Sequence, residues 1–171
     1  PVTEKFKVPM VEAEGASRSL FTQGYKYMFA VLSTSEYYLA PVLDIMADKA
    51  KAMGKNPADL RIYKAFENDG FSLDVRAGVV DKAKEHGMKI VIDDKLPADL
   101  SDMSATLTKT KALKPDILLV SGHSKGAATA ARQIEEMKID VPLIAYTHCE
   151  AAKVQEKFPK SANGVMCPTQ W

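Results

Sequence analysis

The sequence has few cysteines, almost no net charge and no long apolar run, and each shortage narrows the classes of protein to consider. Two cysteines among 171 residues are too few for a disulfide framework. The formal net charge is +1 and the lysines are spread along the chain, which indicates no nucleic-acid partner. The apolar runs are too short to span a bilayer. The overall composition, 26% charged and 46% hydrophobic residues, is typical of one globular domain.

The few cysteines and histidines form no recognisable metal-binding pattern. Cys149 and Cys167 lack metal-ligand spacing, and we expect two buried free thiols, with a bridge between them as the alternative. His148 and Glu150 are close in sequence, but no third or fourth ligand accompanies them. We therefore predict no metal and no cofactor.

The segment from Pro115 to Ala130, PDILLVSGHSKGAATA, shows the clearest local pattern. Its continuous apolar run at 117–120 predicts a strand buried on both faces, which is typical of parallel sheets. Small polar residues follow, and an Ala-rich helical pattern begins at Ala127. The turn at 121–126 should therefore lie at the carboxyl end of a strand and beside a helix N-terminus, where open α/β sheets bind ligands.

Strand and helix patterns alternate along most of the chain. We expect strands at 60–66, 88–92, 117–120, 141–145 and from 164, and helices at 36–53, 71–86, 102–113, 127–137 and 151–158. Strand starts recur about every 27 residues, the length of a βα unit. The pattern predicts an α/β fold, a three-layer αβα sandwich with a doubly wound, mainly parallel sheet. Two more predicted strands, at 6–13 and 25–32, have no full helix between them and indicate a different packing unit.

The loops that follow the predicted strands should share one rim of the sheet. They span 67–72, 93–99, 121–126 and 146–150. Their polar and aromatic side chains are those of Asn68, Asp69, Phe71, Ser121, His123, Ser124, Tyr146, Thr147 and His148. This mixture suits a small polar or aromatic ligand better than a phosphate.

The turn GHSKG also fits the G-x-S-x-G nucleophile elbow, so an α/β serine hydrolase is the alternative function. Ser124 would attack an acyl carbon and His148 would take its proton. The available acids, Glu135 and Asp140, do not lie near the carboxyl ends of the strands, and the chain ends about 20 residues after His148. A receiver-like signalling domain is a third candidate, but the sequence has neither its carboxylate triad nor a Gly-rich phosphate loop.

Four segments carry a resemblance that extends over nearly the whole chain. In order they read VPMVEAEGASRSLFTQGYKYMFAVL, LRIYKAFENDGFSLDVRAGV, LSDMSATLTKTKALKPDILLVSGHSKGAATAARQI and NGVMCPTQW. Together they resemble the type I periplasmic solute-binding proteins of the branched-chain amino-acid (Leu/Ile/Val) ABC transporter family. The resemblance implies a periplasmic, non-enzymatic protein whose two lobes close on a small-molecule solute and deliver it to the membrane permease subunits.

Members of this family are about twice as long, so the resemblance implies that this chain is a second-lobe fragment. Residues 1–34 would be the end of the first lobe and the crossover, 35–164 the second α/β lobe, and 165–171 the strand that returns to the first lobe. The chain starts with Pro1, which we interpret as a removed leader or as the start of a piece. A bare strand edge in the first-lobe part would let two copies pair as a domain-swapped homodimer.

The resemblance also implies site residues. The first-lobe loop that holds the ligand's α-groups corresponds to Gly15, Ala16 and Ser17, and the aromatic wall to Phe71. His123 takes the binding-turn position, where an aromatic residue is common. Thr147 lies near the position that is commonly acidic in amino-acid binders, so an α-ammonium has no evident partner. We expect an aromatic or short organic acid rather than leucine. The predicted ligand-binding residues are Gly15, Ala16, Ser17, Asn68, Phe71, His123, Tyr146 and Thr147.

Overall fold

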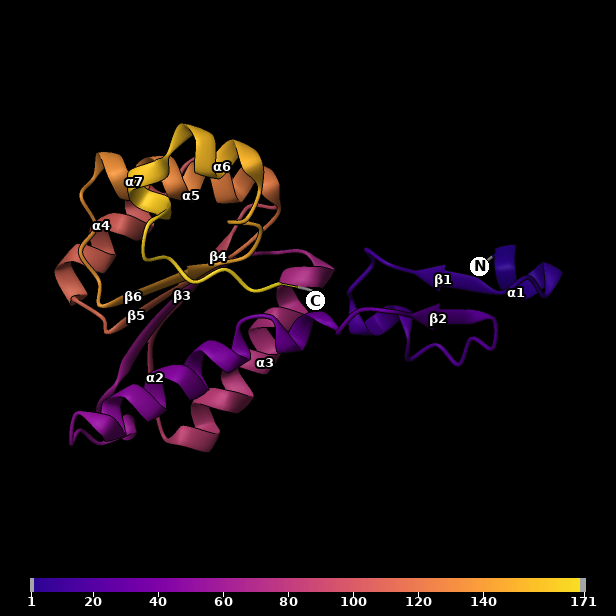
Figure 1. Ribbon diagram of the computed structural model, residues 1–171, viewed down its shortest axis with the longest axis horizontal. Coiled ribbons are helices and arrows are strands. Elements are labelled where there is room, and N and C mark those ends of the chain that lie inside the picture. Colours follow the sequence, from indigo (N-terminus) through magenta and orange to yellow (C-terminus); the bar gives the residue numbers. More distant parts are fainter. Residues whose placement is uncertain (1, 170–171) are drawn as a thin grey trace.

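Four parallel strands form the central sheet of the computed structural model, which describes residues 2–169 apart from the side chains of residues 152 and 153 (Figure 1). The strands lie in the order β4 (Lys89–Leu96), β3 (Arg61–Glu67), β5 (Ile117–Ser121) and β6 (Leu143–Tyr146). Every residue of β5 and β6 is buried, as expected for parallel strands covered on both faces. Met166 adds a parallel bridge to Ala145 at the edge of β6.

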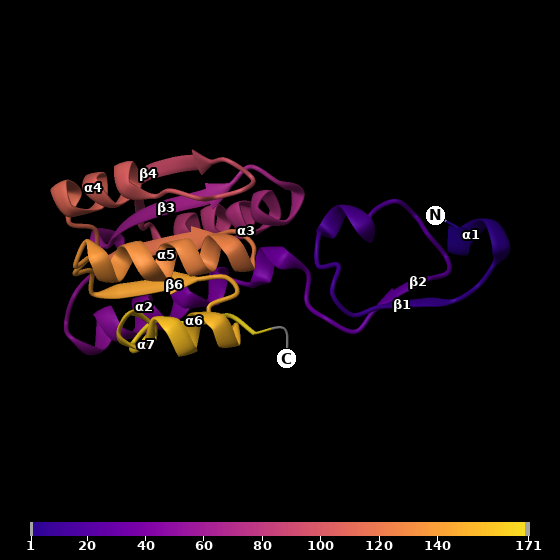
Figure 2. The same ribbon diagram turned by 90° about the horizontal axis from the view of Figure 1, so that it is seen from above.

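Helices cover both faces of the sheet (Figures 1 and 2). α2 (Ala40–Ala52) and α3 (Gly70–His86) pack on one face; α4 (Ser104–Leu113), α5 (Ser124–Glu136), α6 (Ala152–Lys157) and α7 (Pro159–Ala162) lie on the other. Alternate residues of β3 serve the two cores, because successive side chains of a strand point to opposite faces. Ile62 and Phe66 pack under α2 and α3, and Tyr63 and Ala65 under α4 and α5. The predicted three-layer αβα fold with a doubly wound parallel sheet is confirmed.

The start of α2 differs from the prediction for a local reason. α2 starts at Ala40, after a 3-10 turn η2 (Ser35–Tyr37), and not at Glu36. Pro41 lies in its first turn, where a missing N–H costs nothing. The four-residue helix α7 was not predicted. Within the described residues, no helix has the length and apolar character needed to cross a membrane.

β4 extends to Leu96, beyond the predicted end at residue 92, because its second half is held by ion pairs. Asp93 pairs with the buried amine of Lys64 on β3, with 2.6 Å between Nζ and Oδ1. Asp94 points to the other face and pairs with Lys109 at 3.0 Å. Burial lowers the pKa of Lys64, and Asp93 opposes that shift. Asp93 and Asp94 interrupt the run of apolar residues from which a buried strand is predicted. The sequence pattern therefore does not show that the strand continues past residue 92.

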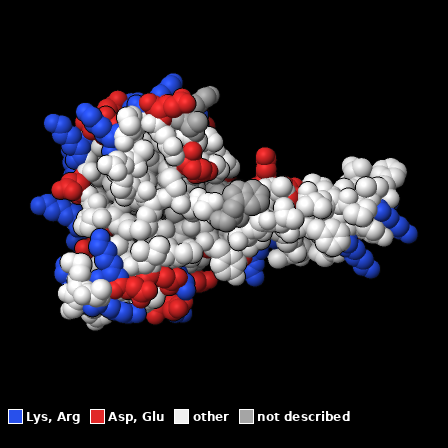
Figure 3. Space-filling view, viewed as in Figure 1, with Lys and Arg blue, Asp and Glu red and all other residues white. Residues whose placement is uncertain are grey.

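An arm that carries the N-terminal residues projects from the part of the molecule that contains the four-stranded sheet (Figures 1 and 2). It contains α1 (Val2–Phe6), β1 (Met10–Glu12), the 3-10 turn η1 (Arg18–Leu20) and β2 (Met28–Ala30). β1 and β2 pair in parallel as a separate two-stranded sheet, as the unusual spacing of the predicted strands suggested. Val11, Phe29 and Val31 are each more than half exposed on it. Figure 3 shows few charged residues on the visible face of the arm.

The base of the arm is fixed to α3 and η2. The Ser17 hydroxyl donates to Asp74 Oδ2 over 2.7 Å, and the Arg18 N–H donates to the same oxygen over 2.8 Å. The Ser35 N–H donates to the Ala16 carbonyl over 2.8 Å. Residues 16–18 are therefore held against α3 and η2, although β1 and β2, which flank them, project away.

The two cysteines are joined, so the prediction of free thiols is wrong. Cys149 and Cys167 form a disulfide, with 5.5 Å between their Cα atoms. The chain returns along β6 after α7, and the bridge at Met166 places the next residue beside the loop that follows β6. This return path depends on tertiary structure, which the spacing of two cysteines does not reveal.

The close approach of η2 to α3 gives a stability prediction. A methyl group on Gly78 would overlap the carbonyl oxygen of Glu36. Helix propensity alone would make Gly78→Ala stabilising by about 0.5–1 kcal/mol. Because the η2 backbone would have to move, we expect the substitution to lower the free energy of unfolding by about 1–3 kcal/mol.

Urea denaturation measures this change. Asp81→Ala, at an exposed position of the same helix, is the matched control and should stay within about 0.5 kcal/mol of the wild type. A Gly78→Ala protein as stable as the wild type would contradict the packing of η2 on α3.

Candidate functional site

The strand order places a switch point between β3 and β5. The chain leaves β3 for β4 on one side of the sheet and leaves β5 for β6 on the other. The loops after β3 and β5 therefore diverge at the carboxyl end of the sheet. In open α/β sheets this crevice is where ligands bind.

Three rings meet at this crevice. Phe71 lies in the first turn of α3, His123 is the N-cap of α5, and His148 follows β6. The ring centroids are 5.7 Å apart for Phe71 and His123, 5.6 Å for Phe71 and His148, and 5.8 Å for the two histidines. Tyr38 packs edge-on against Phe71 at 5.4 Å. This ring cluster, formed by Phe71, His123 and His148, combines an apolar wall with two imidazoles.

A cavity of about 210 Å³ separates the ring cluster from the base of the arm. Five of the predicted site residues line it, and they come from three distant parts of the chain: Gly15, Ala16, Ser17, Phe71 and His123. Glu14, Leu20 and His148 complete the lining. The structure thus brings the arm loop beside the rim of the sheet.

The other three predicted residues lie outside the lining of this cavity. Asn68 is exposed, and its N–H donates to the Leu96 carbonyl over 3.0 Å. Tyr146 is buried in the core under α5, and burial raises its pKa to about 12. Thr147 is buried, and its hydroxyl donates to the Gly122 carbonyl over 2.7 Å and accepts from the Gly122 N–H over 3.0 Å. In this structure Thr147 fixes the turn after β5.

His148 lines the cavity and was not among the predicted ligand-binding residues, although its loop was expected at the rim. Its backbone has φ = 60°, which is uncommon for a residue other than glycine. Nδ1 lies 2.9 Å from the Gly122 carbonyl oxygen. Because a carbonyl only accepts, Nδ1 carries the proton, and Nε2 is the nitrogen left for other partners.

Glu67 lies under the turn after β5 and was not predicted as a site residue. It ends β3 and is only 2% exposed. A Cβ on Gly122 or on Gly126 would overlap its Oε1, so both glycines of the GHSKG turn make room for this carboxylate. Burial raises the pKa of Glu67 to about 7, with a smaller increase from Asp69 and an opposing effect of His123.

The hydrolase alternative is not supported. Ser124 is exposed in the first turn of α5, and no hydrogen bond among the described residues joins it to a histidine. His148 Nδ1 bonds a backbone carbonyl and not a carboxylate. The glycine spacing that suggested a nucleophile elbow is explained by Glu67.

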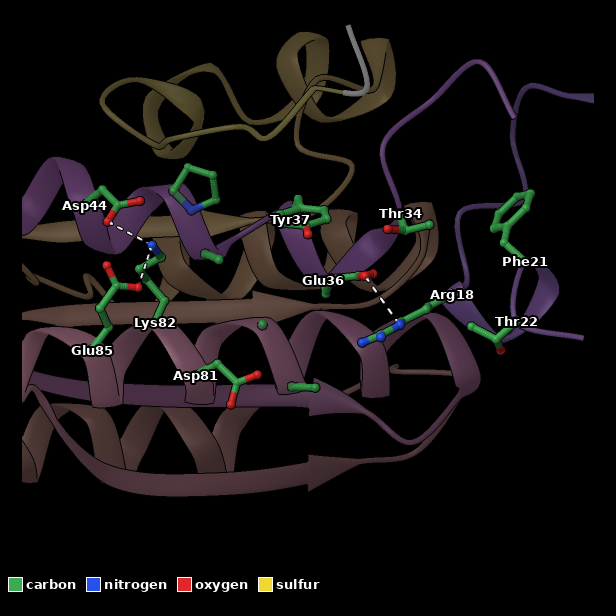
Figure 4. A pocket seen from close by; sticks show the side chains of 14 residues that line it. Arg18, Phe21, Thr22, Thr34, Glu36, Tyr37, Asp44, Asp81, Lys82 and Glu85 are labelled. Carbon is green, nitrogen blue, oxygen red and sulfur yellow. Dashed lines mark ion pairs between the residues drawn. The ribbon is translucent and has the colours of Figure 1, made fainter. Parts of the chain in front are cut away.

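A larger cavity, of about 570 Å³, lies elsewhere (Figure 4). All of its lining residues come from the arm, η2, α2 and α3, and its charged groups apart from Asp81 form ion pairs with one another. Lys82 lies between Asp44 and Glu85, at 3.4 and 2.9 Å, and Arg18 lies 3.9 Å from Glu36. We assign the candidate site to the smaller cavity, because it lies at the switch point of the sheet.

Comparisons with known proteins agree with this fold. A family model described as periplasmic binding protein matches residues 1–171, and the chain belongs to this family. "Leu/Ile/Val-binding protein homolog 8" of Brucella abortus (strain 2308) is 22% identical over 136 residues, which are 79% of this chain and 34% of that relative. The resemblance to the solute-binding proteins of branched-chain amino-acid transporters is confirmed.

Two solved structures share the fold. A leucine-binding protein LivK from Thermotoga maritima has a TM-score of 0.79 at 21% identity, over 100% of this chain and 47% of that one. A solute-binding protein of an ABC transporter from R. palustris, in complex with benzoate, has a TM-score of 0.79 at 11% identity, over 97% and 44%. The chain therefore spans about a third of the curated relative and less than half of each of these structures.

The raised pKa of Glu67 predicts a pH-dependent stability. Glutamate titrates near 4.5 without the fold, and Glu67 titrates near 7 within it, so the folded protein binds more protons between these values. Its contribution is complete below the unfolded pKa and is lost as the pH rises through the folded one. We expect the free energy of unfolding to fall by on the order of 2 kcal/mol between about pH 5 and about pH 8.

Glu67→Gln supplies the control, because glutamine stays neutral over this range. Urea denaturation of both proteins in EDTA at the two pH values gives the difference. If the two proteins lose the same stability between the two pH values, Glu67 is not the buried, protonated group.

Proposed function

We propose that this chain is part of the solute-binding component of an ABC transporter, and that the cavity at the ring cluster is one half of its solute site. The observation that carries the proposal is the meeting of Phe71, His123 and His148 at the switch point, opposite residues 15–17 of the arm. Membership of the periplasmic binding protein family supports an extracytoplasmic location and a role without bond-making chemistry.

The proposed organisation assigns residues 1–34 to the end of the first lobe and the crossover, 35–164 to the second lobe, and 165–171 to the returning segment, whose last two residues lie outside the described ones. The separate sheet of the arm supports this division. So does the length of the related structures, of which the chain covers 47% and 44%. The solute would then lie between the ring cluster and the rest of the first lobe.

The proposed solute is a small carboxylic acid with an aromatic or other flat apolar body. Phe71 offers an apolar face, and the exposed imidazole of His123 offers an N–H donor to a carboxylate. Neither Lys nor Arg occurs among the described residues that line the cavity. Thr147, near the position that would hold an α-ammonium in an amino-acid binder, has no charge and bonds Gly122 instead. The related R. palustris structure contains benzoate, which is such an acid.

The proposed mechanism is a hinge closure. Solute contacts made with both lobes are complete only in the closed form, and this difference in affinity supplies the free energy of closure. The closed form would then be recognised by the membrane permease subunits, which receive the solute unchanged.

Calorimetry of the protein with both lobes tests this function, using benzoate and leucine as probes. We expect benzoate to bind more tightly than leucine. Phe71→Ala and His123→Ala should each weaken benzoate binding about tenfold or more, because each removes a wall or a donor worth at least about 1.4 kcal/mol.

Ser124→Ala is the matched control, since Ser124 adjoins His123 but does not line the cavity, and we expect its affinity to be unchanged. Tight leucine binding without benzoate binding would refute the proposed solute class. Ester hydrolysis that disappears in Ser124→Ala would instead favour the hydrolase.

A further inference from the structure

A cluster of three possible metal ligands lies beside the cavity. Glu67 ends β3, Asp69 is the N-cap of α3, and His123 is the N-cap of α5. One donor atom from each of these residues lies within 4.8 Å of the other two. His123 Nε2 lies 3.7 Å from Asp69 Oδ1. Donor atoms from three separate elements thus lie close together.

Two carboxylate oxygens of this cluster are buried without a hydrogen-bond partner among the described residues. They are Oε2 of Glu67 and Oδ2 of Asp69. Asp69 uses its other oxygen, Oδ1, to accept the Ser72 N–H over 3.0 Å. Burying an acceptor without a partner is costly, and two neighbouring carboxylates also repel each other. A cation at this place would remove both costs.

We propose that Glu67, Asp69 and His123 bind a divalent transition-metal ion of the zinc class. Carboxylate oxygens and an imidazole nitrogen are ligands that such ions take, at about 2.0–2.2 Å. The donors have to draw together to reach these distances. The His123 side chain is 57% exposed and can rotate towards the two carboxylates. Three protein ligands leave a fourth position open, which a solute oxygen would fill.

Two other clusters in the described part of the chain also have three donor atoms within 4.8 Å of one another, but none of their carboxylate oxygens is buried without a hydrogen-bond partner. In the first, His86 Nε2 lies 2.7 Å from Asp44, and Lys82 pairs with both Asp44 and Glu85. In the second, Cys149 and Cys167 form the disulfide. The first of these clusters therefore provides a matched control, with one histidine and two carboxylates that already have partners.

Isothermal titration of the protein with zinc chloride alone tests the proposal. We expect one zinc ion per chain, and an affinity at least about tenfold lower for Glu67→Gln and for His123→Ala. His86→Ala should bind zinc as the wild type does. Circular dichroism establishes that each variant is folded, and His123→Ala changes an exposed side chain, so its result does not depend on core packing.

Three outcomes would overturn the proposal: no zinc binding below millimolar concentration, binding that His123→Ala leaves unchanged, or binding that His86→Ala removes. The proposal does not depend on the proposed function, because the titration contains no solute. A protein that binds benzoate but no zinc would leave the solute site intact and refute the metal site.

Discussion

The turn after β5 is held by groups from both neighbouring strands, and the candidate site depends on this attachment. Glu67 at the end of β3 lies beneath Gly122 and Gly126. Thr147 and His148, after β6, bond the backbone of Gly122 from the other side. His123 follows Gly122 directly, so its ring position is set by both neighbouring strands. The carboxyl ends of three parallel strands thus act as one unit at the switch point.

Much of the fold could be predicted because strands and helices alternate along the chain, and each kind of element shows its own spacing of apolar residues in the sequence. β5 illustrates this, since its four apolar residues are enough to indicate a strand buried on both faces. β4 shows the limit. Its last residues include Asp93 and Asp94, whose place in a strand depends on Lys64 and Lys109. Such pairings link residues that are distant in sequence, and local patterns do not contain them.

The candidate site was predictable in part for the same reason. Phe71 and His123 follow strands, so their place on the rim follows from the topology, whereas Gly15 to Ser17 came only from the family resemblance. Tyr146 belongs to β6 and faces the core under α5, because a shift of one residue at a strand end reverses the side chain's direction. No local sequence pattern marked Glu67 as a site residue, because its burial depends on two glycines that follow a different strand.

The cavity and the carboxylate cluster share one residue, His123. Its ring centroid lies 5.7 Å from that of Phe71 and 5.8 Å from that of His148, and its Nε2 lies 3.7 Å from Asp69 Oδ1. A change at this imidazole would therefore act on both proposed sites. Glu67→Gln keeps the side-chain volume under Gly122 and Gly126 and removes a metal ligand, so it should lower the affinity for zinc far more than the affinity for benzoate. His86 belongs to neither site. This separation lets the two proposals be judged independently.

The three histidines of the sequence provide the most direct measurement of the central claim. In the protein with both lobes, the ring resonances of His86, His123 and His148 can be followed by nuclear magnetic resonance while benzoate is added. The account predicts that His123 and His148 shift together with saturation and that His86, beside Asp44, stays unchanged. Saturable benzoate binding that leaves His123 and His148 unmoved would contradict it.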